Sequence, residues 1–514
     1  MAYSLDYNDT LKFLKAVNIL NSYENIVILS SLTLVLVIGL YSARKVGSNY
    51  PAYFFANKKE NWISIGLSLF AANSFSEYFL IAVSLSLFAW WAIIPIEIVS
   101  MVFLFFFGYY LLPMFIKEKT ATVNEIFEKL FNKKARLILS ALSIISSLSF
   151  RLSLILLSVG ILFYDILGWN FNAFILLMIL ISGIFTVTGG LTSIIKIQFF
   201  QSALLLISTI LLVIFGITKF GNLEGIFVNV SNSSFNFAKL DYLGDVSWIE
   251  IILFAPIAGF WYWCTDQHIT QRILAGSDYY TIKKGITFSF VLKLIPVVFF
   301  ASLGLIASVL TTDISWDKIF SSLINSENFS TTLRLVILFS LSLVLIQSFS
   351  SILISTSTLI TIDFFESRHG INNKNKLVLI GRFIIFILVI SIIFLVPFID
   401  LKNPQLYINL LRYQIYTATP LAAAFAFVFF YKRTTYAGML SGLIIGEAAA
   451  IFRIMLELYA KSFSIIEKIF LPFFNITALQ VSIIIFLLSS SIILLVSYLK
   501  FAPKIQLINF IRKV

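Results

Sequence analysis

Apolar runs long enough to cross a lipid bilayer recur along almost the whole chain of 514 residues. A membrane-spanning helix needs about 20 predominantly apolar residues, and a chain built from such runs cannot fold as a soluble globule. The charged fraction of 12% agrees with this. We predict an all-α polytopic membrane protein with about thirteen transmembrane helices, at about 25–43, 62–88, 90–114, 136–165, 171–188, 191–219, 247–271, 285–310, 331–362, 377–398, 403–431, 437–459 and 476–499.

Basic residues are distributed unevenly between the loops. About 23 of them lie in every second loop, against about eight in the intervening segments. The positive-inside rule places the basic loops in the cytoplasm, so the N-terminus is predicted outside and the C-terminus inside. An odd number of spans requires the same arrangement. We expect a plasma-membrane location, in the inner membrane of a bacterium, with the lipid bilayer as partner, no nucleic acid and no obligate protein partner.

The residues that usually carry metal or hydrolytic chemistry are scarce. Cys264 is the single cysteine, and His268 and His369 are the two histidines. These exclude an internal disulfide and a Cys- or His-rich metal site. No His-Glu-x-x-His helix is present, so we expect no enzyme in the membrane.

Two spans carry polar interruptions. In one, Pro256 precedes residues 259–266, which include the run Phe-Trp-Tyr-Trp-Cys-Thr-Asp. In the other, residues 71–77 (Ala-Ala-Asn-Ser-Phe-Ser-Glu) break an apolar run. Irregular backbone is tolerated at membrane depth only where protein or a water-filled cavity satisfies it. The second interruption lies five spans after the first, which predicts halves of opposite orientation with a binding site between two broken helices.

Several sequence blocks resemble, in the same order, blocks of the sodium:solute symporter family, and most closely its sodium/glucose branch. The resemblance runs from about Tyr53 to Arg433, and its blocks are 71–73 with Glu77, 189–193, 260–267 with 271–272, 284–285 with 293–295, 355–364 and 432–435. It implies a LeuT-type fold with a five-plus-five inverted repeat. It also implies Na⁺-coupled symport of a small-molecule solute, with one co-transported sodium ion.

The resemblance divides the chain into three parts. Residues 1–61 form an outer segment, a first peripheral helix and a cytoplasmic loop. Residues 62–435 form the transporter core, with repeats at about 62–219 and 247–431. Residues 436–514 form peripheral helices and a short cytoplasmic tail.

The family's sodium ligands map onto two facing helices. The implied positions are the carbonyls of Ala71, Ser74 and Val344 and the side chains of Gln347 and Ser348. Gln347 stands where the family has a serine, and Ser350 and Ser351, one turn further on, could compensate. Gln198 stands where members that bind a further cation have an aspartate, so we expect one sodium per solute.

The family's solute contacts map less completely. The implied positions are Asn73, Tyr78, Glu97, Gly259, Tyr262, Trp263, Lys293 and Leu411. Glu97 and Lys293 fall on polar contacts, and Tyr262 falls on the aromatic inner gate. Tyr78, Gly259 and Leu411 replace family amides. In an alternative interpretation, Glu97 and Lys293 only pair with each other to steady the bundle.

The function that the sequence favours is secondary active transport by alternating access, with a sugar or polyol as leading solute. A sodium-independent or proton-coupled carrier, a solute sensor of the same fold, and an amino-acid or organic-acid symporter remain as alternatives. Arg151 interrupts an otherwise apolar run, and its burial demands a partner, either Glu77 or a cluster of carbonyls.

Overall fold

The computed structural model describes residues 23–73, 96–167, 171–220, 247–310, 318–325, 330–367, 370–371, 373–399, 403–459 and 476–500. Within these ranges the chain is helical, and its strand-like structure is one isolated bridge between Glu60 and Gly276. Nine of the helices described there are long and apolar enough to cross a membrane. The predicted all-α multi-pass architecture is confirmed, whereas the count of thirteen spans stays a prediction.

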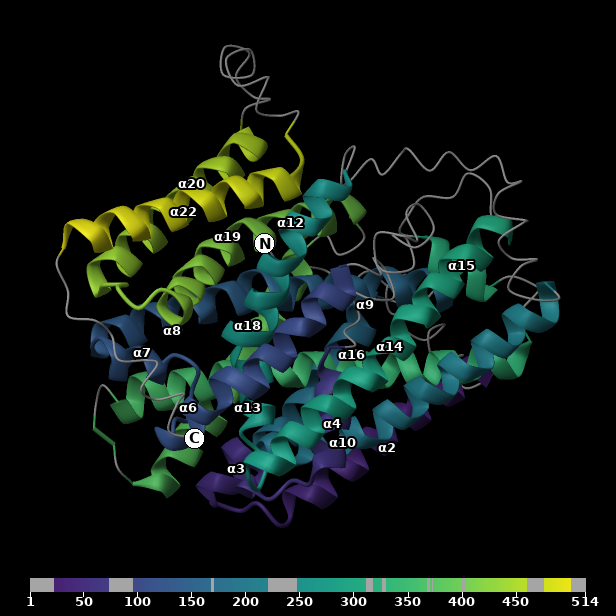
Figure 1. Cartoon of the computed structure of the whole chain (residues 1–514). Helices are drawn as coiled ribbons and strands as arrows, with labels where there is room; N and C mark the ends of the chain where they lie inside the picture. The colour runs from purple at the N-terminus through teal and green to yellow at the C-terminus, as the bar shows by residue number, and fades with distance from the viewer. Residues whose placement is uncertain are drawn as a thin grey trace, which may run out of the picture.

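Helix α16 (Thr331–Leu359) forms the centre of the bundle. Its most apolar 18-residue window is 94% buried, against at most 67% for the other candidate spans in the described ranges. Helices α2 (Tyr23–Ala43) and α10 (Phe171–Phe220) pack against it. Figure 1 shows α2, α4 and α10 in the lower part of the view and the C-terminal helices at the upper left.

The Gly-Gly block divides α10 into two arms. Gly190 has the non-helical angles φ 54° and ψ −145°. A Cβ there would lie 2.3 Å from the carbonyl oxygen of Tyr53, so only glycine fits this turn. The hydroxyl of Ser193 donates to the carbonyl of Gly39 at 2.8 Å and ties the turn to α2. The turn lies between the two spans predicted on either side of this block.

The first interrupted helix is α4 (Trp62–Ala72). Asn73 is its C-terminal cap, which agrees with the interruption predicted at residues 71–77. Ser74, Glu77 and Tyr78 lie outside the described residues.

The second interrupted helix consists of α12 (Trp248–Phe260), a π-helical turn η6 (Trp261–Thr265) and α13 (Gln267–Ile273). The break is narrower than predicted. Pro256 lies inside α12, and the first extended residue is Asp266, with φ −87° and ψ 126°. The carboxylate of Asp266 accepts from the backbone N–H of His268 at 3.0 Å, which caps α13. The aromatic residues therefore lie in a π-helical turn, and the helical backbone continues without interruption up to Asp266.

The remaining described elements complete the bundle. They are α3 (Tyr50–Phe55), η2 (Ala56–Lys58), η4 (Phe107–Leu111) and α6 (Leu112–Lys117) within the helix Ile96–Lys117, α7 (Glu125–Leu130), α8 (Lys133–Ser146), η5 (Ser147–Arg151), α9 (Leu152–Leu167), α14 (Tyr279–Leu310), α15 (Ile319–Asn325), η8 (Ile360–Glu366), α18 (Lys374–Leu395), η9 (Val396–Phe398), α19 (Pro404–Phe430), α20 (Tyr436–Tyr459) and α22 (Ala478–Leu499). Helices α19, α20 and α22 pack against one another, and α12 packs against α19 and α22.

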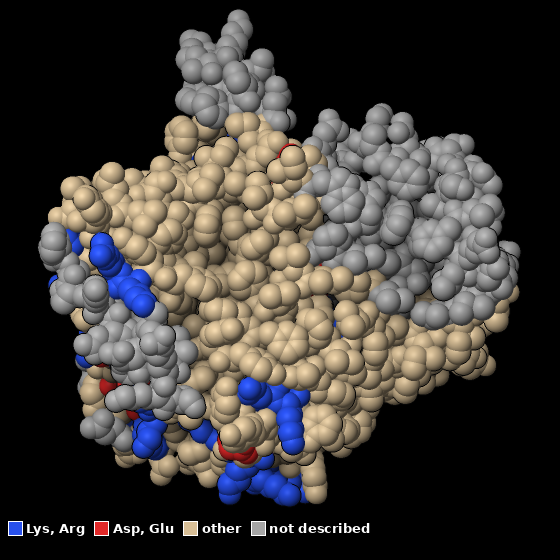
Figure 2. Space-filling view, viewed as in Figure 1, with Lys and Arg blue, Asp and Glu red and all other residues tan. Residues whose placement is uncertain are grey.

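On the face drawn in Figure 2, the charged side chains are concentrated along part of the edge. Figure 2 shows the lysine and arginine side chains of this face along its lower and left edges, where Figure 1 shows α3, α6 and α7. The other described parts of the same face are almost uncharged. This separation agrees with the loop asymmetry seen in the sequence.

Candidate functional site

Polar side chains from two other helices satisfy the open end of α4. The hydroxyl of Tyr262 donates to the carbonyl of Ala72 at 3.1 Å, and the ammonium of Lys293 donates to the carbonyl of Asn73 at 3.4 Å. The side-chain oxygen of Asn73 is buried and has no hydrogen-bond partner in the described part of the chain. The structure thus brings Asn73, Tyr262 and Lys293 together, and their contact with solute stays a prediction.

Glu97 joins this group through Lys293. Its carboxylate lies 3.3 Å from the ammonium of Lys293, which is only 2% exposed. Charges held at this depth are costly unless they are paired or solvated. The pair therefore links the helix Ile96–Lys117 to α14 at the end of α4. This geometry is compatible with both interpretations of the two residues, so their contact with solute stays a prediction.

Arg151 has a described partner that was not among those expected. Its guanidinium forms an ion pair with Asp266, at the break between η6 and α13, and lies 3.1 Å from Nδ1 of His268. The guanidinium carbon is 5.4 Å from the ring centre of Trp261 and 5.7 Å from that of Tyr262. Glu77, the expected carboxylate, lies outside the described residues. Asp266 compensates this charge because the extended backbone turns its carboxylate toward η5.

A polar cavity adjoins the ion pair. Six elements contribute to its wall: α8, η5, η6, α13, α16 and α19. Ser147, Arg151, Trp261, Asp266, Ser355 and Gln414 are among the residues that line it. Tyr262 lies between this cavity and the end of α4, because Arg151 contacts its ring while its hydroxyl contacts Ala72. A hydroxyl- and amide-rich wall of this kind can hydrogen-bond a polar molecule.

Three further residues predicted to contact solute are packed into the bundle. Trp263 is 2% exposed and belongs to an apolar cluster, whereas its neighbour Trp261 lines the cavity. A Cβ on Gly259 would lie 2.5 Å from Cα of Ser100, so this glycine permits close helix packing. Leu411 packs against the main apolar core. No contact between these residues and a solute follows from this arrangement, and the prediction for them is untested.

The predicted sodium ligands within the described ranges lie on helices that pack together. Ala71 is at the end of α4, and Val344, Gln347 and Ser348 lie on α16. The hydroxyl of Ser348 donates to the carbonyl of Val344 at 2.8 Å. Ser74 lies outside the described residues. Coordination by this set remains a prediction.

Sequence reasoning overlooked the buried charge of Arg272 beside these residues. The guanidinium of Arg272 donates to Oε1 of Gln198 at 3.2 Å, to Oγ of Ser351 at 2.7 Å and to the main-chain oxygen of His268. Ser68 also donates to Oε1 of Gln198. The Gln-Arg pair at 271–272 was visible in the sequence, but its depth in the bundle was not.

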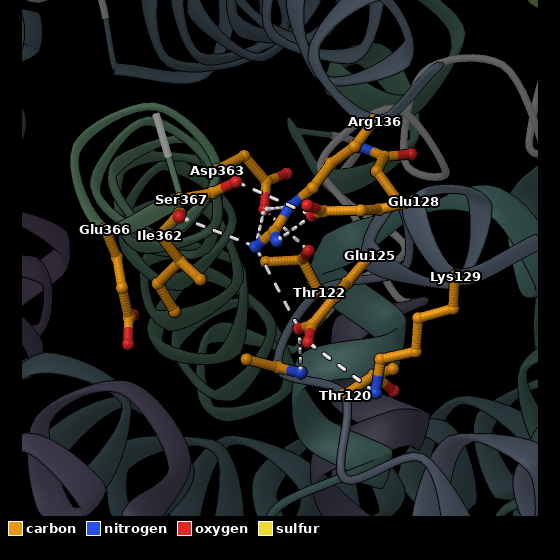
Figure 3. A network of polar contacts seen from close by, with 12 residues as sticks. Thr120, Thr122, Glu125, Glu128, Lys129, Arg136, Ile362, Asp363, Glu366 and Ser367 are labelled. Atoms are coloured by element: carbon orange, nitrogen blue, oxygen red, sulfur yellow. Dashed lines mark hydrogen bonds and ion pairs between the residues drawn. The ribbon is translucent and has the colours of Figure 1, made fainter. Parts of the chain in front are cut away.

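A second polar network, also overlooked, joins α7, α8 and η8 (Figure 3). Asp363 is fully buried and accepts from Nε of Arg136 at 2.8 Å and from the hydroxyl of Thr122 at 2.7 Å, and also from Ser140. Nη1 of Arg136 lies 2.6 Å from Glu128. In the sequence, Arg136 counts only as one more basic loop residue, so its carboxylate partner more than 200 positions away was hidden.

The fold is shared with a solved membrane transporter. The chain superimposes with a TM-score of 0.80 on a substrate-bound, outward-open Na⁺-coupled sialic acid symporter, at 18% identity over 94% of this chain and 98% of that one. It is 27% identical to sodium/glucose cotransporter 1 of Mus musculus, over 93% of this chain and 80% of the relative. It is also 27% identical to the sodium/myo-inositol cotransporter of Homo sapiens, over 82% of this chain and 65% of the relative.

A model of the sodium:solute symporter family matches residues 53–446, and the chain belongs to this family. It is therefore a multi-pass membrane transporter and not an enzyme, and sodium is its co-transported ion. The resemblance identified from the sequence blocks is confirmed.

Proposed function

We propose that this protein couples the inward movement of one sodium ion to the uptake of a small polar solute, most directly a sugar or polyol, by alternating access. One observation carries the proposal: Asn73, Glu97 and Lys293 meet at the open end of α4, where Tyr262 also contacts the helix. An interrupted helix with polar side chains gathered at its end is how transporters of this type build a solute site near the bilayer midplane. The glucose and myo-inositol named for the two cotransporters support a hydroxylated solute.

The chemistry of the charged pair suits hydroxyl groups. A carboxylate accepts and an ammonium donates, so together they orient a ring of hydroxyls by charge-assisted hydrogen bonds. Tyr262 supplies an aromatic surface beside them. Tyr78, Gly259 and Leu411 replace amides of the family pattern, which favours a solute with fewer hydroxyl contacts than glucose makes in its relatives.

The sodium ion is assigned to oxygens of α4 and α16. We infer ligation by the carbonyls of Ala71, Ser74 and Val344 and by the side chains of Gln347 and Ser348. A stoichiometry of one follows from Gln198, which is neutral and already accepts hydrogen bonds from Ser68 and Arg272. The charge carried per neutral solute in proteoliposomes should be one, and a ratio of two would contradict the assignment.

Uptake into proteoliposomes tests the function as a whole. Sugars, polyols, amino acids and organic acids are offered in turn with a Na⁺ gradient, and again with K⁺ in place of Na⁺. We expect concentrative uptake of a sugar or polyol only with Na⁺. Equal uptake in K⁺ would favour a sodium-independent carrier, and uptake driven by a pH gradient alone would favour proton coupling.

An acidic solute is the second candidate. It is favoured by the guanidinium of Arg151 in the wall of the polar cavity and by the sialic acid named for the structural neighbour. The pairing of Arg151 with Asp266 argues against it, because the ion pair compensates the charge that an anion would need. Competition between myo-inositol and glucuronate for the same uptake separates the candidates: only the neutral polyol should compete under the leading proposal.

The charged edge of the face drawn in Figure 2 supports a proposal for the orientation in the membrane. We propose that the repeats at about 62–219 and 247–431 have opposite orientation, with the N-terminus outside and the C-terminus in the cytoplasm of the cell whose plasma membrane holds the protein. A cysteine introduced at Ser231 should react with an impermeant maleimide in intact cells, and one at Asn373 should not. The native thiol of Cys264 is buried, so it gives little background. The reverse labelling pattern would overturn the topology.

A further inference from the structure

The side chain of Gln347 carries an acceptor that the protein leaves unused. Gln347 lies on the central helix α16 and is 1% exposed, and its amide oxygen has no hydrogen-bond partner in the described part of the chain. A buried amide oxygen without a partner costs free energy in an apolar interior. Such an atom beside a predicted cation site indicates that a ligand completes its bonding.

Hydrogen-bond logic fixes which way the amide faces. The hydroxyl of Ser351 donates its single proton to the main-chain oxygen of Gln347 at 2.7 Å. Its oxygen then accepts from Nε2 of Gln347 and from Nη2 of Arg272. A hydroxyl has one proton and two lone pairs, so all three are used. The amide oxygen of Gln347 therefore cannot face Ser351, because two acceptors would meet.

Arg272 gives this chain of hydrogen bonds its direction. A guanidinium only donates and stays protonated at every relevant pH, so Ser351 must always accept from it. Arg272 is itself held in place by Oε1 of Gln198 and the main-chain oxygen of His268. The hydrogen bonds therefore connect Arg272 on α13 to Ser351 and Gln347 on α16. They leave the amide oxygen of Gln347 without a partner among the described residues.

We propose that Arg272 and Ser351 are positioning residues that hold the amide of Gln347 with its oxygen presented as a ligand for sodium. Sodium is a hard cation that prefers oxygen, and an amide turned the other way would present its N–H₂ group and repel the ion. Gln347 thereby replaces the hydroxyl found at this position in the family pattern. Ser351 does not compensate as a ligand, because its oxygen is already saturated. The inference rests on the proposed sodium coupling.

The test compares Ser351→Ala with Ser342→Ala. Ser342 is a matched control because it is equally buried on α16 and its hydroxyl donates to its own helix, at the carbonyl of Leu338. Half-saturating sodium is measured by solute uptake and, independently, by sodium-dependent thermal stabilisation without solute. We expect Ser351→Ala to raise half-saturating sodium about tenfold in both measurements, a loss of ~1.4 kcal/mol. Solute affinity at saturating sodium should change less than twofold, and Ser342→Ala should leave sodium activation unchanged.

Conservative variants separate positioning from a general structural effect. Ser351→Thr keeps the hydroxyl and should restore sodium affinity to within about twofold of the original chain, since one hydrogen-bonding group is retained. If Ser351→Ala does not fold, Ser351→Cys is compared with Ser342→Cys instead, because a thiol is a weak acceptor of similar shape. Unchanged sodium affinity in the folded Ser351 variant would overturn the positioning role while leaving sodium coupling intact. A wild-type protein without sodium stabilisation or activation would overturn both.

Discussion

Two buried arginines of this transporter differ in the charge of the groups that they contact. Arg136 contacts three carboxylates, those of Asp363, Glu128 and Glu125, whereas the hydrogen-bond partners of Arg272 are a glutamine, a serine and a main-chain carbonyl. Both clusters join helices that are distant in the sequence. The contrast indicates that a charge-balanced cluster holds helices together. A cluster whose polar atoms lack hydrogen-bond partners can instead bind a ligand.

The side chains nearest the two guanidinium groups differ in the polar atoms that they leave without a hydrogen-bond partner. Beside Arg272, Nε2 of Gln198 and Oε1 of Gln347 have no hydrogen-bond partner among the described residues. Beside Arg136, both oxygens of Asp363 accept hydrogen bonds, from Thr122 and Arg136 on one and from Ser140 on the other. A fully satisfied buried pair adds rigidity, and removing one partner leaves an uncompensated charge.

Breaking the balanced cluster should give the largest effect. Asp363→Asn leaves the guanidinium of Arg136 without its buried carboxylate, and we expect a loss of about 3–5 kcal/mol of stability. Thermal unfolding in detergent measures this loss. Asp363→Leu combined with Arg136→Met should recover much of it, because both charges leave together.

The control for that experiment is Lys129→Met. Lys129 lies in the same network but is partly exposed, with Glu118 at 3.4 Å, and exposed ion pairs contribute ~1 kcal/mol or less. If Asp363→Asn lowers the stability no more than Lys129→Met does, the network does not hold the helices together. The contrast between the two arginines would then be wrong for Arg136.

The pair Glu97–Lys293 should give the next largest effect, on transport and not on folding. If both residues contact solute, Glu97→Gln and Lys293→Met each remove a charge-assisted hydrogen bond worth roughly 1.5–3 kcal/mol. Half-saturating solute should then rise about tenfold or more. If the two only pair with each other, each single change lowers stability and the double change restores it. Wild-type solute affinity in the double variant would exclude the binding role.

A carboxylate beside Arg272 should move that cluster toward the balanced type. Gln198→Glu keeps the shape of the side chain and places a negative charge at the Nε–H of Arg272. We expect a gain of about 1 kcal/mol in stability, within the range of charged hydrogen bonds. Gln198→Leu, which removes the acceptor, should lower stability. Equal losses in both variants would show that Arg272 is not short of a counter-charge.

Much of the fold was predictable from the sequence, because apolar runs and glycine turns are local signals. The block around Gly190 and the interruption after Ala72 were located to within a few residues. The extent of the second interruption was wrong, because Pro256 sits inside a helix and the π-helical turn that follows has no simple signal in the sequence. The partners of Arg136, Arg151 and Arg272 were not predictable, since each depends on which helices become neighbours.

The smallest expected effect concerns a carboxylate that belongs to neither cluster. Asp278 precedes α14 and accepts from the backbone N–H of Thr281 at 3.0 Å, from its hydroxyl at 2.7 Å, and from Ser277. These hydrogen bonds, that of the Thr281 N–H first, lower the pKa of Asp278 to about 2. The ordinary value is about 3.9, so the charged form favours the folded state. The stability advantage of wild type over Asp278→Asn should be complete above about pH 5, shrink as the pH falls below about 4, and vanish near the folded-state pKa.

Thermal unfolding of both proteins between pH 7 and pH 3 measures this advantage, and a difference that does not depend on pH would contradict the capping charge. Because asparagine also caps helices well, the difference isolates the charge from the hydrogen bond. If Asp278→Asn lowers the stability as much as Asp363→Asn, then burial does not decide how much a carboxylate of this protein contributes to stability.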